Sequence, residues 1–485
     1  MRRAAIASAL LLAGCAGTPN VSGVRGASPA PEVPWTPPRD AVPRIVAADT
    51  SAEAAVPPDI ADRVQRLTLA EIVDLGLRNN PTTRLAWANA QTAASVYGSE
   101  RGAWFPTIDG DVSAARLKTA ASQGRSAVEQ SVLDPSVTLN YLLFDFGGRT
   151  GRIAGARQRL LAASFTHNAA IQDVVLQVQV AYFQYLANRA LLSAQGTTLE
   201  EAQTNLTAAE ERRRVGLATI ADVLQARTAA SQARLDLQTT EGNVQTTRGA
   251  LALALGLPAN LPYDVDSTAA AAPVAPLADS VNAIIATALQ GRPDLAAIQA
   301  EVEAARAGIG ETRAALFPSL GFSATGGRTY ATTIPDGANS YTLSLGLTIP
   351  LFNGFSRQYD VRAAEFEAEA ARARSLSLRQ EVVFQVFSAY YALQTATRRV
   401  GTAGDLLASA EQSNEVALGR YKAGVGSVLD LLAAQTALAD ARAQQVEARL
   451  AWSVSLAQLA HDADILDPRG GSLLRLTQDT TSTPR

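Results

Sequence analysis

Two segments of the sequence carry charged side chains and turn-forming residues in the same order. In the first segment, Arg212 is followed by Gly216 and then by Asp222. The second segment repeats this order with Arg420, Gly424 and Asp430. Cations in a last helical turn, a glycine just after it, and an acid three residues after Thr or Ser are common at helix ends and helix starts. The pattern therefore predicts a tight turn between two helices at each segment.

The acids of these segments suggest a second role. Where several copies of such a turn converge, a ring of carboxylates attracts cations, repels anions and supports a closed constriction. Helix capping accounts for Asp222 and Asp430 by itself. Both roles therefore stay open for these residues, and the two can coexist.

No other group of residues has the composition of a catalytic or metal-binding site. The chain has one Cys and two His, and His167 and His461 lie in helical stretches where a structural role is expected. The sequence has no glycine-rich phosphate-binding loop. A formal net charge of −3 provides no excess of cations for nucleic acid. We therefore expect no enzyme activity, no cofactor, no metal and no nucleic-acid partner.

The N-terminal segment is predicted to be an export signal. Two arginines precede a short apolar stretch, and small residues lead directly to Cys15, the only cysteine of the chain. This order resembles the bacterial lipoprotein box, which implies that residues 1–14 are removed and that Cys15 carries a covalent lipid. Because Ala16 follows instead of Asp, the lipoprotein pattern implies the outer membrane. Residues 15–66 are rich in proline and are predicted to be a linker.

The chain is internally duplicated. Asn80-Pro81 corresponds to Arg292-Pro293, and Trp104-Phe105-Pro106 corresponds to Leu316-Phe317-Pro318. The two turn segments described above correspond as well. Each copy reads helix, strand, loop, strand, long helix, tight turn and helix.

The duplication sets the expected domain organisation. We predict a first repeat at residues 67–256, a linker at 257–278, a second repeat at 279–466 and a flexible C-terminal tail at 467–485.

Each repeat contains two segments in which apolar and polar residues alternate. From Tyr341 to Ile349, every odd position is apolar and every even position is small or polar. Strands of about ten residues match the length that crosses a bilayer at a tilt. The pattern predicts two membrane-spanning β-hairpins, at residues 105–146 and 317–353. A soluble sandwich with one wet face is the alternative.

Helical periodicity follows the second strand of each repeat. An unbroken helix from about Thr150 to Val215 would be about 100 Å long at 1.5 Å per residue. A plain structural coiled coil has the same spacing.

Two hairpins leave open sheet edges, and lipid cannot satisfy exposed backbone groups. Closing the sheet into a barrel therefore requires several copies of the chain. The residues alone do not determine whether the barrel has eight, twelve or sixteen strands.

Over residues 67–462 the chain resembles the TolC family of outer-membrane factors. The resemblance depends on the duplicated plan, the Asn-Pro in the first helix, the Phe-Asp and Phe-Asn segments after the hairpins, and the Arg-x3-Gly-x5-Asp pattern at the turns. It implies an α+β membrane protein. Long α-helical hairpins would form a periplasmic α-barrel, and four transmembrane β-strands per chain would close as a 12-stranded β-barrel in a homotrimer.

The resemblance and Cys15 together point to the lipoprotein branch that serves multidrug efflux pumps. The implied function is the outer-membrane exit duct of a tripartite efflux pump. It would passively conduct drugs or toxic compounds from an inner-membrane pump and a periplasmic adaptor (membrane fusion) protein. The same architecture could serve type I protein secretion or metal-cation efflux. A periplasmic coiled-coil lipoprotein scaffold is an alternative of another class.

In the resembled family, the second helical hairpin bears the inner constriction. This implies a periplasmic gate at Asp430, with Tyr421 and Leu429 beside it and Asp222 as a secondary member. The family pattern often has a charged residue where this chain has Ala433, so apolar packing at Leu429 is an alternative to a charged ring. The resemblance also implies adaptor contacts at the hairpin tips, at Arg212, Gly216, Arg420 and Gly424.

Overall fold

The computed structural model describes residues 67–119, 128–261, 263–265, 280–332 and 334–466. The predicted signal peptide, Cys15 with its lipid, the linker at 15–66 and the tail at 467–485 lie outside these residues. The chain divides into two units between Pro57 and Pro58, and all the described residues lie in the second unit.

The two repeats have the same order of elements. The first comprises α3 (Leu69–Asn79), α4 (Pro81–Arg101), a 3₁₀ turn η4 (Gly102–Trp104), β1 (Thr107–Thr119), β2 (Val128–Phe144), α5 (Gly148–Arg214) and α6 (Ile220–Ala254). The second comprises α7 (Val281–Gly291), α8 (Pro293–Ala314), β3 (Ser319–Ala331), β4 (Ile334–Thr348), α9 (Ser356–Lys422) and α10 (Val428–Asp462). Among these described helices, none is both long enough and apolar enough to cross a membrane.

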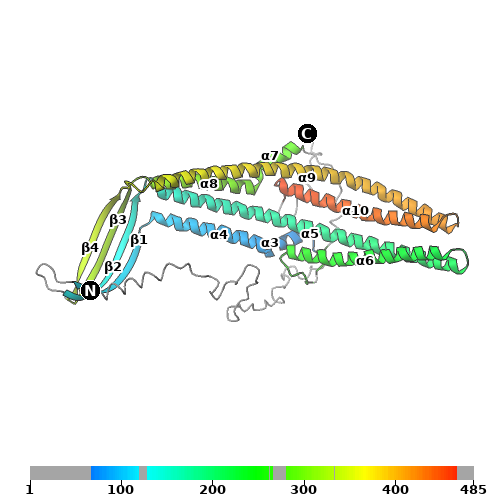
Figure 1. Ribbon diagram of the computed structural model, residues 1–485, viewed down its shortest axis with the longest axis horizontal. Coiled ribbons are helices and arrows are strands. Elements are labelled where there is room, and N and C mark those ends of the chain that lie inside the picture. The colour runs from blue at the N-terminus through cyan, green and yellow to red at the C-terminus, as the bar shows by residue number, and fades with distance from the viewer. Residues whose placement is uncertain (1–66, 120–127, 262, 266–279, 333, 467–485) are drawn as a thin grey trace, which may run out of the picture. The chain divides into compact units, whose positions relative to one another are not determined.

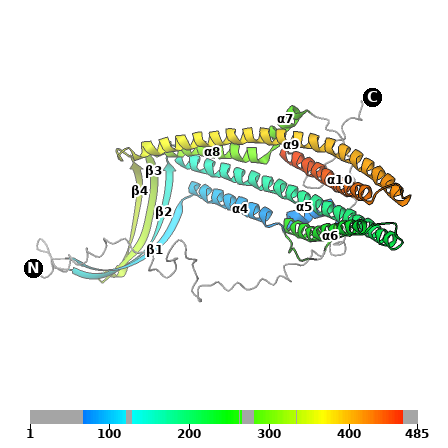
Figure 2. The same ribbon diagram turned by 45° about the vertical axis from the view of Figure 1, so that its right-hand side comes forward.

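The strands lie at one end of the helices, and the α5–α6 and α9–α10 turns lie at the other (Figures 1 and 2). Helices α5 and α9 each have 67 residues, so each is about 100 Å long at 1.5 Å per residue. Helices α6 and α10, with 35 residues each, return along them. The two long helical hairpins therefore separate the sheet from the tips by the length of one helix.

The four strands form one antiparallel sheet in the order β1-β2-β3-β4. Strand β2 of the first repeat pairs with β3 of the second, so the sheet joins the repeats. Within the described chain, β1 and β4 have a partner on one side only. The strands have 13, 17, 13 and 15 residues, so the expected length of about ten was too short. Backbone pairing continues beyond the apolar alternation into a charged end, which hydropathy alone does not mark as strand.

The sheet has one apolar face and one polar face. Large apolar side chains are exposed on one face: Ile108, Val112, Val137, Tyr341, Leu343, Leu345 and Leu347. On the other face, hydroxyl groups bond across strands, with 3.1 Å between the Oγ1 atoms of Thr138 and Thr325 and 2.7 Å between the Oγ atoms of Ser323 and Ser344. Strand alternation places the two kinds of side chain on opposite faces.

The chain passes from strand to long helix through two residues in the left-handed region. These are Phe146 and Gly147 before α5, with φ of 51° and 93°, and Gly354 and Phe355 before α9, with φ of 66° and 65°. A carboxylate oxygen of Asp145 accepts the backbone N–H of Arg149 in the first turn of α5. The Phe-Asp segment therefore turns the chain and caps the helix that follows.

Equivalent residues of the two repeats hold the short helices in place. The side-chain amide of Asn80, between α3 and α4, donates to the carbonyl oxygen of Ala254 at the end of α6 (3.0 Å). The guanidinium of Arg292, between α7 and α8, donates to the carbonyl oxygen of Asp462 at the end of α10 (3.4 Å). Each contact satisfies a carbonyl that a helix end leaves unpaired.

Candidate functional site

Each helical hairpin ends in a glycine turn. Gly216 and Gly424 have φ of 83° and 77°. The backbone N–H of Leu217 donates to the carbonyl of Arg212 (2.8 Å), and that of Val425 to the carbonyl of Arg420 (3.0 Å). These bonds pair carbonyls of the last turns of α5 and α9. The two predicted turns are therefore present, and both glycines adopt a conformation that a Cβ disfavours.

Each hairpin then continues with a capping box. A carboxylate oxygen of Asp222 accepts the backbone N–H of Thr219 (2.8 Å), while the Thr219 hydroxyl accepts the N–H of Asp222 (3.2 Å). Asp430 and Ser427 make the same pair of bonds at 3.3 and 3.1 Å. Both acids thus cap helices, and their gating role stays a prediction.

Arg212 connects the two tips. Its Nη2 donates to the carbonyl oxygens of Tyr421 (2.9 Å) and Lys422 (3.1 Å), which are the last two residues of α9. Its guanidinium carbon lies 4.3 Å from the centre of the Tyr421 ring. A cation at a helix C-terminus is favoured by the helix dipole, and a guanidinium over an aromatic ring adds a cation–π contact. Arg212 was predicted to contact an adaptor, and in this structure it holds the first hairpin to the second.

Tyr421 and Leu429 differ in their exposure at the second tip. The Tyr421 side chain is buried, with 8% of the residue exposed, and packs with Val428 and Leu431. The Tyr421 hydroxyl has no hydrogen-bond partner among the described residues. Leu429 is 59% exposed and is not part of this cluster. Of the two, only Leu429 offers its side chain to another surface in this arrangement.

Asp430 and Arg420 line the same groove on the second hairpin. The groove has a volume of about 700 Å³ and also includes Gly426 and Ala433. Arg420 occupies the position equivalent to Arg212, yet it lines this groove instead of binding the other tip. The structure thus brings Arg212 to Tyr421 and Arg420 near Asp430.

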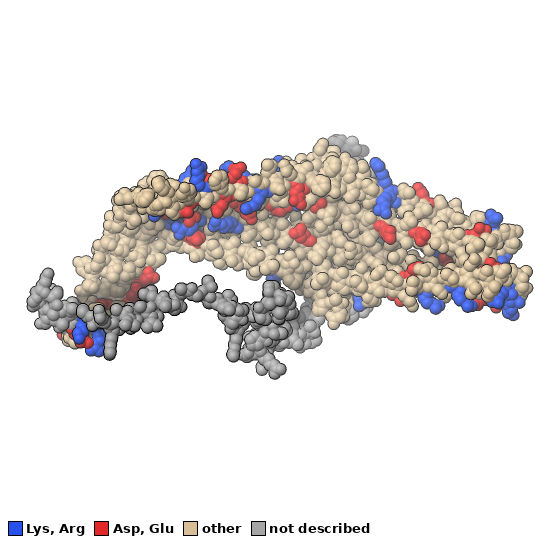
Figure 3. Space-filling view, viewed as in Figure 1, with Lys and Arg blue, Asp and Glu red and all other residues tan. Residues whose placement is uncertain are grey.

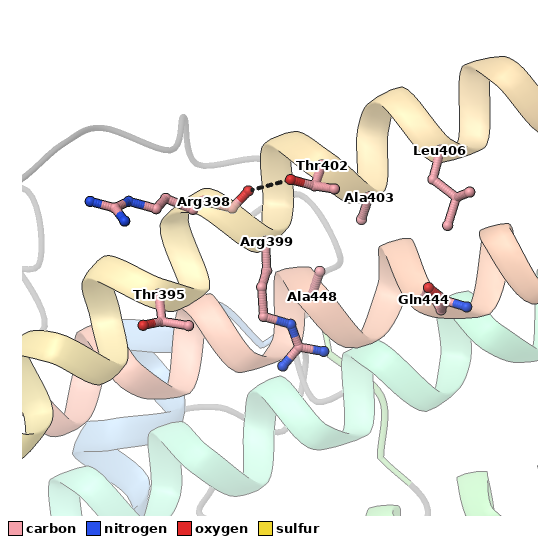
Figure 4. A pocket seen from close by; sticks show the side chains of 8 residues that line it. All are labelled: Thr395, Arg398, Arg399, Thr402, Ala403, Leu406, Gln444 and Ala448. Carbon is pink, nitrogen blue, oxygen red and sulfur yellow. Dashed lines mark hydrogen bonds between the residues drawn. The ribbon is translucent and has the colours of Figure 1, made fainter.

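A second groove lies farther from the tips, between α9 and α10 (Figure 4), with a volume of about 310 Å³. Arg399 points toward the space between these helices, whereas Arg398 points away from it. No carboxylate lines this groove. Over the described residues, no group of three or more His, Cys, Asp and Glu side chains is placed to hold a metal ion.

His461 lies between two carboxylates. Its Nε2 is 2.9 Å from Asp173 of α5, and its Nδ1 is 3.0 Å from Asp462 of α10. The imidazole is mostly buried, with 14% of the side chain exposed. Burial alone lowers the pKa of His461, but the hydrogen bonds with Asp173 and Asp462 outweigh it and raise the pKa to about 9. The His461 side chain is therefore protonated and charged at neutral pH. It connects the end of α10 to α5.

Sequence reasoning missed two of these contacts. It treated Arg212 and Tyr421 separately, although the repeat pattern already placed both at hairpin tips. It assigned His461 a structural role without identifying its carboxylate partners. Asp462, the adjacent residue, was a visible signal, whereas Asp173 lies 288 residues away in the chain.

The sequence profile of a known family matches both repeats. The family is described as Outer membrane efflux protein, and the matched residues are 72–257 and 284–461. The two matched segments coincide with the two structural repeats. The chain belongs to this family.

Named relatives agree with this assignment. Protein CyaE of Bordetella pertussis is 30% identical over 428 residues, which cover 87% of this chain and 88% of the relative. The solvent efflux pump outer membrane protein SrpC of Pseudomonas putida is 26% identical over 377 residues, which cover 76% of this chain and 79% of the relative.

Solved structures share the fold. The CmeC outer membrane channel of Campylobacter jejuni superposes with a TM-score of 0.74 at 20% identity, covering 81% of this chain and 85% of that one. The open state of the MtrE outer membrane channel of Neisseria gonorrhoeae gives a TM-score of 0.70 at 21% identity, covering 81% and 88%. The predicted α+β fold and the resemblance to outer-membrane factors are confirmed.

Family membership defines what the chain does at the level of its class. It is an outer-membrane efflux protein, as predicted, and the family is one of efflux channels and not of enzymes. The prediction of an outer-membrane location is confirmed as well.

Proposed function

We propose that three copies of this chain form a continuous exit duct of a tripartite efflux pump. The observation that carries the proposal is the sheet with two unpaired outer edges, β1 and β4. Unpaired backbone groups cannot face lipid, so these edges need strands from other copies. Three copies of a four-stranded sheet supply twelve strands, and a closed barrel leaves no edge.

The two faces of the sheet support this arrangement. The apolar face suits contact with lipid, and the face with bonded Thr and Ser hydroxyls suits a water-filled interior. Below the sheet, α5 and α9 would extend the duct through the periplasm.

Transport through such a duct is passive. The energy for transport would come from an inner-membrane pump, coupled to the duct through a periplasmic adaptor. Several relatives are named for the efflux of solvents, toluene or antibiotics. We infer that this chain conducts similar small toxic compounds.

The tips supply the gate and the adaptor contact in this proposal. The contact of Arg212 with the end of α9 holds the hairpins together and favours a closed state. An adaptor that engages Gly216, Arg420 or Gly424 would compete with that contact. Asp430 and Leu429 would line the constriction. A lipid on Cys15 would add an anchor to the outer membrane.

Cross-linking of the sheet edges tests this assembly. The native cysteine is changed to Ser, and cysteines are introduced in pairs at exposed positions of β1 and β4, such as Ser113 with Ser340 and neighbouring registers. If β1 of one copy pairs with β4 of the next, at least one register forms disulfides and gives covalent trimers on denaturing gels. The same trimers conduct ions in planar bilayers.

Two outcomes would contradict the proposal. One is a monodisperse soluble monomer that forms no cross-links in any register. The other is a covalent ladder that ends at two or four copies. Cysteines placed on β2 and β3, which are already paired within the chain, are the matched control and give no cross-links between copies.

A further inference from the structure

The apolar face of the sheet ends in a set of cations. Along β1, Ile108, Val112 and Ala114 share one face, and alternation places Arg116 and Lys118 on the same face beyond them. Both cations are well exposed, with 75% and 74% of their side chains accessible. The face that contacts lipid therefore changes from apolar to basic along β1, in the direction away from the helices.

The second hairpin repeats this change. Strand β3 carries Phe322, Ala324 and Gly326 on the same face of the sheet, followed by Arg328, which is exposed. Arg328 lies nine residues beyond Ser319, the start of β3, as Arg116 lies nine residues beyond Thr107, the start of β1. The two arginines occupy equivalent positions of the internal repeat. In a trimer they would form a ring at one height.

The height of this ring corresponds to the outer membrane surface. Nine residues of strand span about 30 Å, or roughly 23 Å of height at a tilt of about 40°. The apolar band of an outer-membrane barrel is about 25 Å tall and is bordered by aromatic residues. Tyr330 lies beside this border, with its ring centre 5.3 Å from the Arg328 guanidinium carbon. The arginines therefore lie where lipid head groups begin.

The three cations at this end of the sheet outnumber the carboxylates near them. Glu129, opposite Lys118 in the sheet, lies 2.8 Å from Arg116 and 4.0 Å from Lys118. Arg328 donates to the backbone carbonyl of Asp336. No ion pair between the side chains of Arg328 and Asp336 occurs in the described chain. Three cations thus share this surface with two carboxylates, only one of which is paired.

Basic and acidic side chains lie at different places on the sheet. In the view of Figure 3, the sheet surface next to the helices carries no Lys or Arg, acidic side chains appear along its lower edge, and basic side chains appear at its far end. The carboxylates of Asp109, Asp111 and Asp134 alternate onto the opposite, polar face. They therefore do not neutralise the lipid-facing cations.

We propose that Arg116, Lys118 and Arg328 bind the phosphate groups of lipids in the outer leaflet. Arginine donates in pairs to phosphate oxygens, and each basic residue at a membrane surface strengthens binding to anionic lipid about fivefold. The apolar side chains below the cations contact the acyl chains of the same lipid. The inference rests on the proposed orientation of the sheet in the outer membrane.

Lipid binding to the purified, detergent-solubilised oligomer tests the proposal. Native mass spectrometry compares lipid A that carries both phosphates with the same lipid after its phosphates are removed. The wild-type protein is expected to prefer the phosphorylated lipid. The Arg116→Gln, Lys118→Gln, Arg328→Gln triple variant loses that preference by roughly tenfold or more. Glu129→Gln strengthens it.

The matched control removes three cations from the helices, with Arg234→Gln, Arg374→Gln and Arg379→Gln, and keeps the wild-type preference. An equal loss in this control would mean that only net charge matters and would overturn the proposal. So would a wild-type protein that binds both lipids equally. Displacement of the lipid by millimolar inorganic phosphate would instead indicate a site for free phosphate.

Two further measurements distinguish a failure of the lipid-binding proposal from a failure of the proposed duct on which it rests. If the triple variant of the sheet, with Arg116→Gln, Lys118→Gln and Arg328→Gln, dissociates into single chains in detergent without lipid, the native side chains hold the copies together. The lipid site is then refuted. Both variants are expected to conduct ions as the wild type does. A wild-type oligomer that conducts no ions refutes the proposed duct, whereas conduction without lipid preference refutes only the lipid site.

Discussion

Residues at equivalent positions of the two tips make different contacts. Arg212 and Arg420 correspond in the repeat, as do Arg213 and Tyr421. Of the two, only Arg212 reaches across to the other hairpin, because the second tip presents an aromatic ring and helix-end carbonyls while the first presents Arg213 in place of the ring. The contact between the tips is therefore asymmetric within each chain.

Loss of the Arg212 side chain is expected to open the duct. Arg212→Ala removes two charge-assisted hydrogen bonds and a cation–π contact, together worth about 1–2 kcal/mol at a partly exposed site. The open fraction would rise roughly 5- to 30-fold, as measured by single-channel conductance or antibiotic leak. Arg213→Ala, a neighbouring exposed arginine, is the control. Equal conductance in the two variants would contradict the proposed contact.

Asp430→Asn separates gating from capping. Asn retains an oxygen that can accept the backbone N–H of Ser427, so the helix start changes little. If Asp430 forms a charged ring, the preference for cations falls and conductance rises, as measured from reversal potentials in a salt gradient. Unchanged reversal potential and conductance in an intact oligomer would restrict Asp430 to capping. Asp430→Ala removes both functions and is expected to leak more.

At the scale of elements, charged and close contacts fix how the second repeat meets the first. His461 joins the last turn of α10 to Asp173 in the middle of α5. Asp464, just after α10, accepts a hydrogen bond from the side chain of Gln172 (2.6 Å). Two adjacent residues of α5 thus hold the end of the second repeat.

The His461 contact makes stability depend on pH in the alkaline range. The pKa of His461 is about 9 in the folded chain and 6.5 for the free side chain, so the folded state favours the proton. The resulting stabilisation is fully present below about pH 6.5 and is lost as the pH rises through about 9. Thermal unfolding from pH 6 to 10 is expected to show this loss, and His461→Gln is expected to flatten it. An unchanged slope in the variant would exclude His461 as the source.

The same close backbone contact occurs in both repeats, and the glycine lies on opposite sides of it. After α6, Gly256 has φ of 71° and lies against Asn79; a Cβ there would be 2.5 Å from the Asn79 carbonyl oxygen. After α10, the equivalent residue is Asp464, which has φ of 59° and lies against Gly291, the equivalent of Asn79. Each pair keeps one glycine at the close approach.

Gly256→Ala is therefore expected to destabilise the protein. A Cβ would meet backbone atoms that cannot move aside, and the positive φ adds strain, at about 1–3 kcal/mol in total. Chemical or thermal unfolding of the oligomer measures the change. The control is Gly196→Ala within α5, where a Cβ meets nothing within 4 Å and helix propensity improves. Equal stability of the two variants would contradict the packing argument.

At the scale of the whole assembly, the polar face of the sheet would set the charge of the interior of the proposed barrel. Asp109 and Asp111 of β1 and Asp134 of β2 lie on this face, and the described strands place no Lys or Arg there. Asp→Asn at all three positions is expected to lower the preference for cations over anions, as measured by reversal potential. Gln130→Glu on the same face adds charge and is expected to raise it. No change in either variant would mean that the tips alone determine ion preference.

The sequence by itself determined the class of this protein. Apolar residues repeat at period two in the strands and near 3.6 in the helices, so each element reveals which of its faces is covered. The duplication then set the order of elements twice, and the glycine turns and capping boxes marked the hairpin ends. These features depend on neighbours in the chain, and they were predictable for that reason.

The tertiary structure decided which distant residues meet. The contacts of Arg212 with Tyr421 and of His461 with Asp173 join residues more than 200 positions apart, and periodicity carries no information about such partners. The strands also extended past the expected length, because backbone pairing with a neighbouring strand continues where the apolar pattern stops. Burial patterns specify faces, whereas the packing of one repeat against the other specifies partners.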